Sequence, residues 1–328
     1  MTDLVAVDIG GTHARFALAA IGAEGAIKLG EPETLRTREH ADFQAAWDAF
    51  RARQGGTLPA AAALAFAGPI TGNVIQLTNH PWRIRLAELA EHLRIERLTV
   101  VNDFEAVGHA VARAGAEHFV HLAGPDQPLA TRGTVSILGP GTGLGVAHLA
   151  RDGDGGYRVQ ATEGGHMGFA PLDTVEDAIL ARLRERYGRV SVERVVSGPG
   201  IVDIYRTLAE LDGRSATELD DVAIWKGGLS GEDELAMATI ERFCLALGSV
   251  AGDVALVQGG FGGVVIAGGL GYRIRETLRT SGFAHRFALK GRYEELMASI
   301  PVKLITHPQP GLFGAAAAFA REHLETTP

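Results

Sequence analysis

The sequence predicts an α/β protein built from two related halves. Through the first hundred residues, short apolar runs alternate with segments of helical periodicity, a pattern that favours a sheet with parallel strands. A plan of strand, glycine-rich turn and strand is found at residues 4–18 and again at 134–150. The chain has 328 residues, of which 46% are hydrophobic, and this is sufficient for the cores of two domains.

Charge and cysteine content exclude several classes of protein. The formal net charge of −8 argues against non-specific binding to nucleic acid or to an anionic membrane. Cys244 is the single cysteine, which rules out an internal disulfide and a cysteine-rich metal site. Residues 254–272 are uncharged but include seven glycines, which disfavour a membrane-spanning helix. No basic leader precedes the first strand, and we therefore expect a cytoplasmic protein.

The elements of the first half follow from run length and periodicity. Residues 61–67 form an apolar run that ends at Gly68-Pro69, as a buried strand would. Residues 83–93 carry apolar side chains at helical spacing. We expect strands at 4–8, 14–20, 61–67 and 98–101, and helices at 41–53, 83–93 and 104–114.

In the second half, helical segments dominate after residue 170. Asp173 and Glu176 have the spacing of a capping box, and an apolar face continues from there to Tyr187. Pro199 lies near the first position of the following helix, a place that proline favours. We expect strands at 134–138, 146–150, 264–267 and 302–306, helices at 173–187, 201–211, 230–258 and 311–321, and a helical segment after 272.

The turn after the first strand carries candidate ligand-binding groups. Adjacent glycines allow backbone N–H groups to approach an anion closely, and a neighbouring carboxylate is a suitable ligand for hydrated Mg²⁺. The alternative is an ordinary hairpin with a Gly-Gly turn. The candidates for nucleotide and metal binding here are Asp8, Gly10, Gly11, Thr12 and Arg15.

A second candidate pair follows the strand at 98–101. Asn102 and Asp103 stand at its carboxyl end, directly before a helical segment. Ligands of open α/β sheets bind at the carboxyl ends of the strands, so position and residue type both favour a functional site. Asparagine and aspartate are also good helix N-caps. Spacing alone does not distinguish these two interpretations.

Two further glycine-rich turns lie at 139–145 and 268–271. A Rossmann dinucleotide site requires a helix directly after its glycines, whereas an apolar strand follows residue 145. The chain contains no Gly-Lys pair and therefore no Walker A lysine. A bound nucleoside triphosphate would be held by backbone amides, Mg²⁺ and arginine instead.

Three side chains in the second half suit a polyhydroxylated ligand. Glu163 and His166 flank a Gly-Gly pair, and Glu193 precedes the glycine-containing loop at 197–200. Carboxylates and imidazoles exchange hydrogen bonds with sugar hydroxyls. The alternatives are solvated surface charges for the two glutamates and a partly buried structural histidine. No HExxH motif or paired Cys/His spacing indicates a metal site.

Taken together, the motifs resemble the bacterial glucokinase family of ATP-dependent hexose kinases, within the actin/hexokinase ATPase superfamily. They occur in the family's order and cover essentially the whole chain. The matching segments are 8–15, 67–72, 78–82, 101–104, 139–145, 163–166, 193–200 and 261–269.

The resemblance implies a role for each matching residue. Asp103 corresponds to the catalytic base, which also contacts the sugar. The turns at 10–12 and 141–143 correspond to two phosphate loops, and 268–269 to the adenosine region. The implied glucose-binding residues are Asn102, Asp103, Glu163, His166 and Glu193, and the implied nucleotide-binding residues include Gly141, Thr142, Gly143, Gly268 and Gly269.

The resemblance also implies an architecture and a reaction. Two α/β domains of the actin/hexokinase-like (ribonuclease H-like) fold would enclose a cleft, with residues 1–113 and 307–328 in the small domain and 114–306 in the large one. The expected enzyme is a homodimeric glucokinase that uses ATP and Mg²⁺, with Asp8 orienting the metal through water. Related kinases carry a cysteine-rich zinc motif that this chain lacks, so zinc is not expected.

Two alternatives stay open at this stage. One is a kinase for another hexose or an amino sugar, or one that uses another phosphoryl donor. The other is a sugar-responsive regulator built on the kinase fold. Such a regulator needs an N-terminal helix-turn-helix module, and the first phosphate turn already begins at Asp8. We therefore expect the enzyme.

Overall fold

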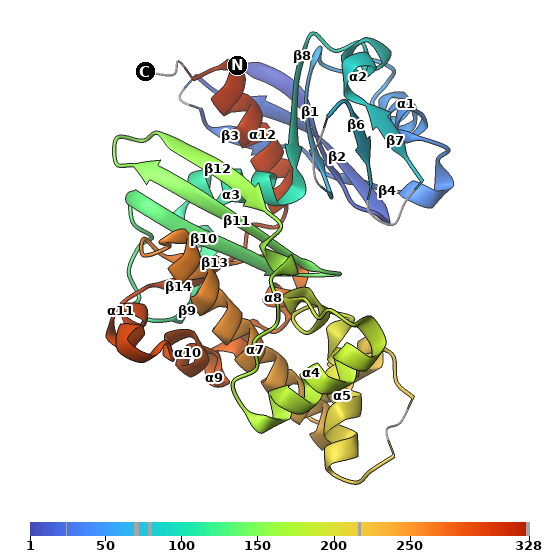
Figure 1. Ribbon diagram of the computed structural model, residues 1–328. Helices are drawn as coiled ribbons and strands as arrows, with labels where there is room; N and C mark the ends of the chain where they lie inside the picture. The colour runs from blue at the N-terminus through green and yellow to red at the C-terminus, as the bar shows by residue number, and fades with distance from the viewer. Residues whose placement is uncertain (24, 69–71, 78–80, 216–217, 326–328) are drawn as a thin grey trace. The chain divides into compact units, whose positions relative to one another are not determined.

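The computed structural model describes residues 1–328 except 24, 69–71, 78–80, 216–217 and 326–328. The chain divides into two compact units (Figure 1). The first consists of Met1–Ala114 and His307–Pro328, and the second of Gly115–Thr306. Parts of two predicted motifs lie outside the described residues, namely 69–71 of the motif at 67–72 and 78–80 of the motif at 78–82.

A mixed sheet forms the centre of the first unit. Its strand order is β3-β2-β1-β5-β8, with β4 also paired to β2. The β1, β5 and β8 strands run parallel, whereas β2 is antiparallel to β1. A separate hairpin pairs β6 with β7. The bounds are β1 Thr2–Ile9, β2 His13–Ile21, β3 Ile27–Leu29, β4 Glu33–Arg36, β5 Ala61–Phe66, β6 Val74–Gln76, β7 Arg83–Arg85 and β8 Arg97–Asn102.

Both faces of this sheet are covered, which explains why its central strands are continuously apolar and buried at residues 4–7 of β1 and along the whole of β5. One face packs against α1 (Phe43–Arg53) and α2 (Leu86–Leu93) through an aromatic core that includes Phe16 and Trp47. The other face is covered by α3 (Asp103–Arg113) and the C-terminal α12 (Pro310–His323). In Figure 1, α12 lies beside the strands formed by the start of the chain. Residues from both ends of the sequence therefore complete one core.

Small residues allow α3 and α12 to approach closely. A Cβ on Gly314 of α12 would stand 1.7 Å from the backbone carbonyl oxygen of Ala106 in α3. Because a backbone atom cannot move aside as a flexible side chain does, this crossing accommodates only glycine. The alanine-rich composition of α12 thus reflects close packing as well as helix propensity.

The second unit is built on another mixed sheet, with the strand order β12-β11-β10-β13-β14-β9. The β10, β13 and β14 strands are parallel, and β11 is antiparallel to both of its neighbours. The repeated plan predicted from sequence is confirmed, since β10–β11 repeats the β1–β2 hairpin. The bounds are β9 Phe119–Ala123, β10 Arg132–Pro140, β11 Leu144–Asp152, β12 Tyr157–Thr162, β13 Val264–Ile266 and β14 Val302–Ile305.

Helices supply most of the core of the second unit. The longest, α7, buries small and apolar residues along its length and packs against α5, α6 and α10. No described helix is long and apolar enough to cross a membrane. The bounds are α4 Thr174–Tyr187, α5 Gly200–Leu211, α6 Asp221–Ser230, α7 Glu234–Gln258, α8 Gly268–Arg273, α9 Arg275–Thr280, α10 Phe283–Ala288 and α11 Glu294–Ala298.

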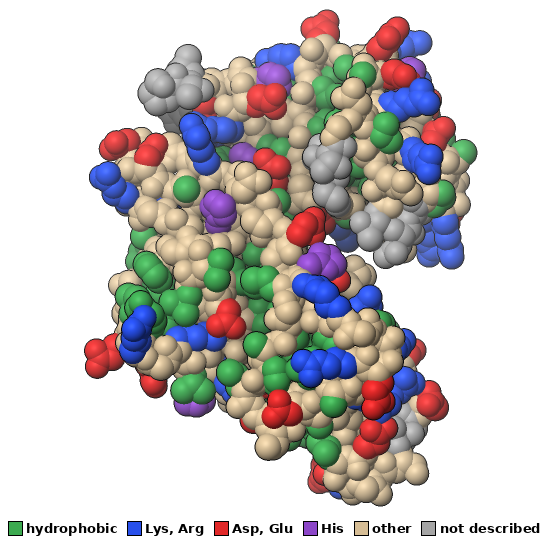
Figure 2. Space-filling view, viewed as in Figure 1, with side chains coloured by type: hydrophobic (Ala, Val, Ile, Leu, Met, Phe, Trp, Pro, Cys, Tyr) green, Lys and Arg blue, Asp and Glu red, His purple; other side chains and the backbone are tan. Residues whose placement is uncertain are grey.

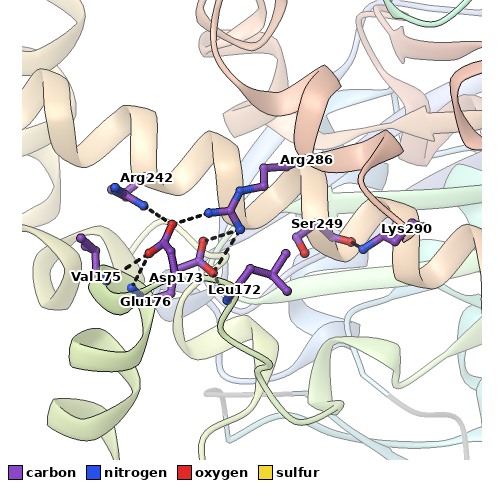
Figure 3. Close-up of polar contacts among 8 residues, drawn as sticks. All are labelled: Leu172, Asp173, Val175, Glu176, Arg242, Ser249, Arg286 and Lys290. Atoms are coloured by element: carbon purple, nitrogen blue, oxygen red, sulfur yellow. Dashed lines mark hydrogen bonds and ion pairs between the residues drawn. The ribbon is translucent and has the colours of Figure 1, made fainter. Parts of the chain in front are cut away.

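An ionic cluster connects three of these helices (Figure 3). Asp173 caps the N-terminus of α4 and also accepts hydrogen bonds from Arg242 of α7 and Arg286 of α10. The Glu176 carboxylate, 2% exposed, pairs with Arg286 and accepts a hydrogen bond from the backbone N–H of Leu172. The cluster fixes the start of α4 against α7 and α10.

Several predicted boundaries were wrong. Residues 83–85 form β7, and the helix begins only at Leu86. The helix expected at 230–258 begins at Glu234, because α6 ends at Ser230 and Asp233 caps α7. Gly139 and Pro140 belong to β10, which shortens the glycine-rich turn to 141–143. Short strands such as β3 and β6 were missed, since three residues carry too little periodicity to distinguish a strand.

Candidate functional site

The parallel strands of the first unit end in one row. Ile9 of β1 is paired with Phe66 of β5, and Phe66 with Asn102 of β8. Because neighbouring strands are about 4.8 Å apart, the turn after β1 and the start of α3 lie two strands, or about 10 Å, from each other. The candidate residues of the first unit therefore share one sheet edge, at the carboxyl ends of its strands.

The turn after β1 closes a hairpin, and a residue from outside the turn stabilises it by hydrogen bonds. The Gly10 N–H donates to the carbonyl oxygen of His13 at 2.9 Å, so this amide closes the hairpin. Thr37, which is 1% exposed, donates through its hydroxyl to Gly11 at 2.9 Å and through its N–H to Thr12. The segment is therefore a hairpin in geometry, and Thr37 fixes the path of the candidate phosphate turn.

Asp8 lies beside this turn, with its side chain 20% exposed. Arg15 approaches it at 3.3 Å between Nη1 and Oδ2. A Cβ on Gly311 of α12 would stand 2.6 Å from the same carboxylate oxygen, so only glycine leaves this space. Burial raises the pKa of the Asp8 carboxyl above its ordinary value, and Arg15 lowers it by less.

The surroundings of Asp8 fit a hydrated magnesium ion. Mg²⁺ prefers oxygen ligands and is usually held by one or two carboxylates together with water and substrate phosphates. Asp8 offers one such carboxylate at the sheet edge, on a side chain that is 20% exposed. Among the described residues, no group of three or more His, Cys, Asp and Glu side chains forms a metal cage.

At the end of β8, the structure distinguishes between Asn102 and Asp103. Asn102 is the N-cap of α3, and its Oδ1 accepts from the N–H groups of Phe104 and Glu105 at 2.8 and 3.2 Å. Its Nδ2 donates to the carbonyl oxygen of Gly68 at 2.9 Å. Asp103 occupies the first turn of α3, and its Oδ1 accepts from the N–H of Phe104 at 2.9 Å. Capping is thus performed mainly by Asn102.

The second unit repeats the arrangement of strand ends. Leu138 of β10 is paired with Ile266 of β13 on one side and Val146 of β11 on the other, and Val146 is paired with Thr162 of β12. The turn at 141–143, Glu163 and the Gly268–Gly269 pair follow these strand ends directly. The turn predicted at 268–271 was wrong, because these residues form the start of α8. A Cβ on Gly268 would stand 3.2 Å from the carbonyl oxygen of Pro140, so this helix start lies beside the turn at 141–143.

The three predicted sugar-binding residues of this unit lie together. The His166 Nδ1 atom is 3.5 Å from Glu193 Oε1, and its Nε2 atom is 3.9 Å from Glu163 Oε2. His166 and Glu163 are exposed, whereas the Glu193 side chain is only 24% exposed. The imidazole therefore stands between two carboxylates, and the three side chains present both hydrogen-bond donors and acceptors.

The backbone beneath these side chains is fixed by residues 189–192. Gly168 and Ser191 form an isolated β-bridge, and the Val192 N–H donates to the carbonyl oxygen of Met167 at 2.8 Å. Arg189 donates to the carbonyl oxygen of His166 at 2.6 Å. Residues 166–168 and 189–192, which precede and follow α4 in the sequence, are thus held beside each other by hydrogen bonds.

Comparison with known proteins reveals the family. A model of the glucokinase family matches residues 4–322. Glucokinase of Zymomonas mobilis is 54% identical over 323 residues, which cover 98% of this chain and 99% of that protein. The chain belongs to the glucokinase family. The reaction class predicted from the motifs, that of a glucokinase, is thereby confirmed.

Solved structures agree with the family assignment. The crystal structure of a glucokinase from an Antarctic psychrotroph superposes with a TM-score of 0.86 at 33% identity, covering 98% of this chain and all of that one. A ROK family glucokinase from Streptomyces griseus, solved with glucose and AMPPNP, gives a TM-score of 0.63 at 18% identity over 96% and 98% of the two chains. The predicted actin/hexokinase-like fold is confirmed.

Sequence reasoning missed the residues that support the candidate site. Thr37, Arg189 and Gly311 each contact the backbone or side chain of a candidate residue, but all three are far from it in sequence. Thr37 and Arg189 lie outside the motifs, and Gly311 merely precedes an alanine-rich run. No local signal marks such residues, because their role depends on chain segments that meet only in the fold.

Proposed function

We propose that this member of the glucokinase family transfers the γ-phosphoryl group of MgATP to the 6-hydroxyl of glucose, giving glucose 6-phosphate and ADP in the first step of glycolysis. The observation that carries the proposal is family membership over essentially the whole chain. Glucose is bound by Asn102, Asp103, Glu163, His166 and Glu193. A homodimer, which the family resemblance implies, is part of the proposal.

Asp103 is the proposed general base. Of the two polar residues at the end of β8, Asn102 has its amide oxygen occupied by two backbone N–H groups, and an amide does not accept a proton at neutral pH. Asp103 carries a carboxylate, which can accept a proton, in the first turn of α3. It accepts the proton of the 6-hydroxyl while that oxygen bonds to the γ-phosphorus and the bond to the ADP oxygen breaks.

The nucleotide is held without a Walker lysine. The proposed contacts are the turns at 10–12 and 141–143, Arg15, and Gly268 with Gly269 near the adenosine. Because the N–H groups of Gly10 and Gly141 are bonded within their own turns, we assign phosphate binding to the remaining amides of these turns. Asp8 would hold Mg²⁺ through water, and the ion when bound neutralises phosphate charge.

The experiment for this proposal is Asp103→Asn, which keeps the shape and removes the proton acceptor. We expect kcat to fall by about 10²–10⁴-fold, which is the usual contribution of general base catalysis. The Kd for glucose should change by less than about threefold. Titration calorimetry with glucose and a coupled assay measure the two quantities. Glu105→Gln, on the same helical turn, is the matched control and should keep its kcat.

Near-wild-type kcat in Asp103→Asn would eliminate Asp103 as the base. The same coupled assay, run across mannose, N-acetylated amino sugars and polyphosphate, determines the range of acceptors and donors. A preference for one of these over glucose and ATP would replace the proposed substrates without changing the family.

A further inference from the structure

Gly143 ends the turn between β10 and β11, and its backbone does not explain why glycine is present. Its φ lies outside the left-handed region, so other residues could adopt this conformation. What a side chain would meet is Glu193. A Cβ on Gly143 would stand 2.7 Å from Glu193 Oε2, well inside van der Waals contact. The missing side chain at 143 therefore leaves space for that carboxylate.

The same carboxylate also faces the sugar-binding turn. Its other oxygen, Oε1, is 3.5 Å from Nδ1 of His166. Glu193 thus stands between the imidazole on one side and the turn at 141–143 on the other. One oxygen is directed at each of them.

The backbone holds the two segments together, so the turn cannot simply move away. Gly198 donates its N–H to the carbonyl oxygen of Gly141 at 2.7 Å, and the Gly141 N–H donates to Gly143 at 2.8 Å. The indole N–H of Trp225 donates to Gly198 at 3.3 Å. With the backbone fixed in this way, a side chain at 143 would be accommodated by displacement of the Glu193 carboxylate, which is the flexible partner.

We propose that Gly143 is a positioning residue for sugar binding: it lies in the nucleotide turn and sets the place of the Glu193 carboxylate. The inference rests on the proposed function, which makes Glu193 a sugar ligand and 141–143 a phosphate turn. It adds that the turn assigned to the nucleotide lies next to a carboxylate assigned to the sugar, so a side chain at 143 would weaken sugar binding.

The direct test is Gly143→Ala, with glucose affinity measured by titration calorimetry in the absence of nucleotide. We expect the Kd for glucose to rise about tenfold, an effect typical of residues in contact, with an unchanged melting temperature because only a side-chain end must move. Gly168→Ala is the matched control. Gly168 lies beside the sugar-binding turn, but a Cβ there has no atom within 4 Å, and its Kd should stay within about twofold of wild type.

A second measurement separates displacement of Glu193 from any other effect of the methyl group. Gly143→Ala is combined with Glu193→Ala, which removes the collision, and with Glu193→Gln, which retains the shape. In the coupled assay, kcat/KM for glucose should respond to Gly143→Ala in the Glu193→Gln background and hardly at all in the Glu193→Ala background.

The outcomes are distinguishable. Unchanged glucose affinity in Gly143→Ala overturns the inference, as does an equal loss of kcat/KM in the Glu193→Ala background, and both leave the proposed reaction intact. If Glu193→Gln alone binds glucose as wild type does, the sugar-binding role of Glu193 fails and the inference fails with it. A wild-type chain that does not phosphorylate glucose would overturn the proposed function itself.

Discussion

At the scale of single residues, the buried charge of Asp8 lowers the stability of the folded state. Its carboxyl is largely buried beside Arg15 and Gly311, and burial raises its pKa by more than the arginine lowers it. A raised folded pKa means that the charged form is less favourable in the folded state than in the unfolded chain. At neutral pH the charge therefore costs stability, which fits a residue retained for function.

Asp8→Asn should raise the melting temperature by a few degrees at pH 7 while abolishing most activity. This gain in melting temperature should shrink as the pH falls below the raised pKa of folded Asp8 toward the ordinary value of 3.8, because the Asp8 carboxyl of the wild-type protein then becomes neutral as well. Thermal scans between pH 4 and 8 measure the difference. Asp3→Asn, an exposed change on the same strand, serves as the control, and a lower melting temperature for Asp8→Asn at pH 7 would contradict the prediction.

At the scale of elements, α4 is fixed by charges rather than by apolar packing alone. Glu176 and Arg286 are 2% and 8% exposed, and Asp173 joins them to Arg242 (Figure 3). The segment between His166 and Asp173 connects this ionic cluster to the proposed sugar-binding turn. The charges on the face shown in Figure 2, in contrast, are of both signs and interspersed, as in an ordinary solvated surface.

Arg286→Met should lower the free energy of unfolding by about 3–5 kcal/mol, because it leaves the Glu176 carboxylate buried without its cation. Glu176→Gln added to this variant should recover much of the loss, since the amide still accepts from Leu172 and carries no charge. Urea denaturation measures both. Arg279→Ala removes a half-exposed ion pair and should cost less than about 1 kcal/mol. A similar cost for Arg286→Met and Arg279→Ala would refute the argument.

At the scale of the whole molecule, the first unit depends on both ends of the chain. His109 of α3 is 7% exposed and packed near α12. Burial lowers its pKa to about 4, with smaller contributions from Arg321 and Arg113 and an opposing one from Glu325. Because an unfolded histidine titrates near 6.5, the unfolded chain binds the proton first, and this unit loses stability as pH falls from 6.5 to about 4.

His109→Gln should therefore reduce the acid sensitivity of the protein. The difference between the melting temperatures at pH 7 and pH 5 should be several degrees smaller than in wild type. His92→Gln, at an exposed position of α2, is the control and should leave this difference unchanged. An identical difference in wild type and His109→Gln would show that burial of His109 does not govern acid stability.

The positions of the candidate residues at strand ends were predictable because these residues lie in local motifs. Glycine pairs, the Asn-Asp pair and the Glu-Gly-Gly-His segment each follow a strand end, and parallel strands bring their carboxyl ends to one edge. Prediction was weaker where several local structures compete. Asn102 and Asp103 are equally good caps in isolation, and the carbonyl of Gly68, in the segment that follows β5, accepts a hydrogen bond from Asn102 that sequence does not reveal.

The sequence by itself determined the α/β class, the two repeated hairpins and the family, because these depend on periodicity and on residues close in the chain. Only the tertiary structure decided which of two neighbours caps α3, that Thr37 and Arg189 support the candidate turns, and that Gly143 leaves space for Glu193. The physical reason is that packing and hydrogen bonding act through space, between segments that are far apart in the sequence. No local sequence pattern indicates which of these segments are in contact.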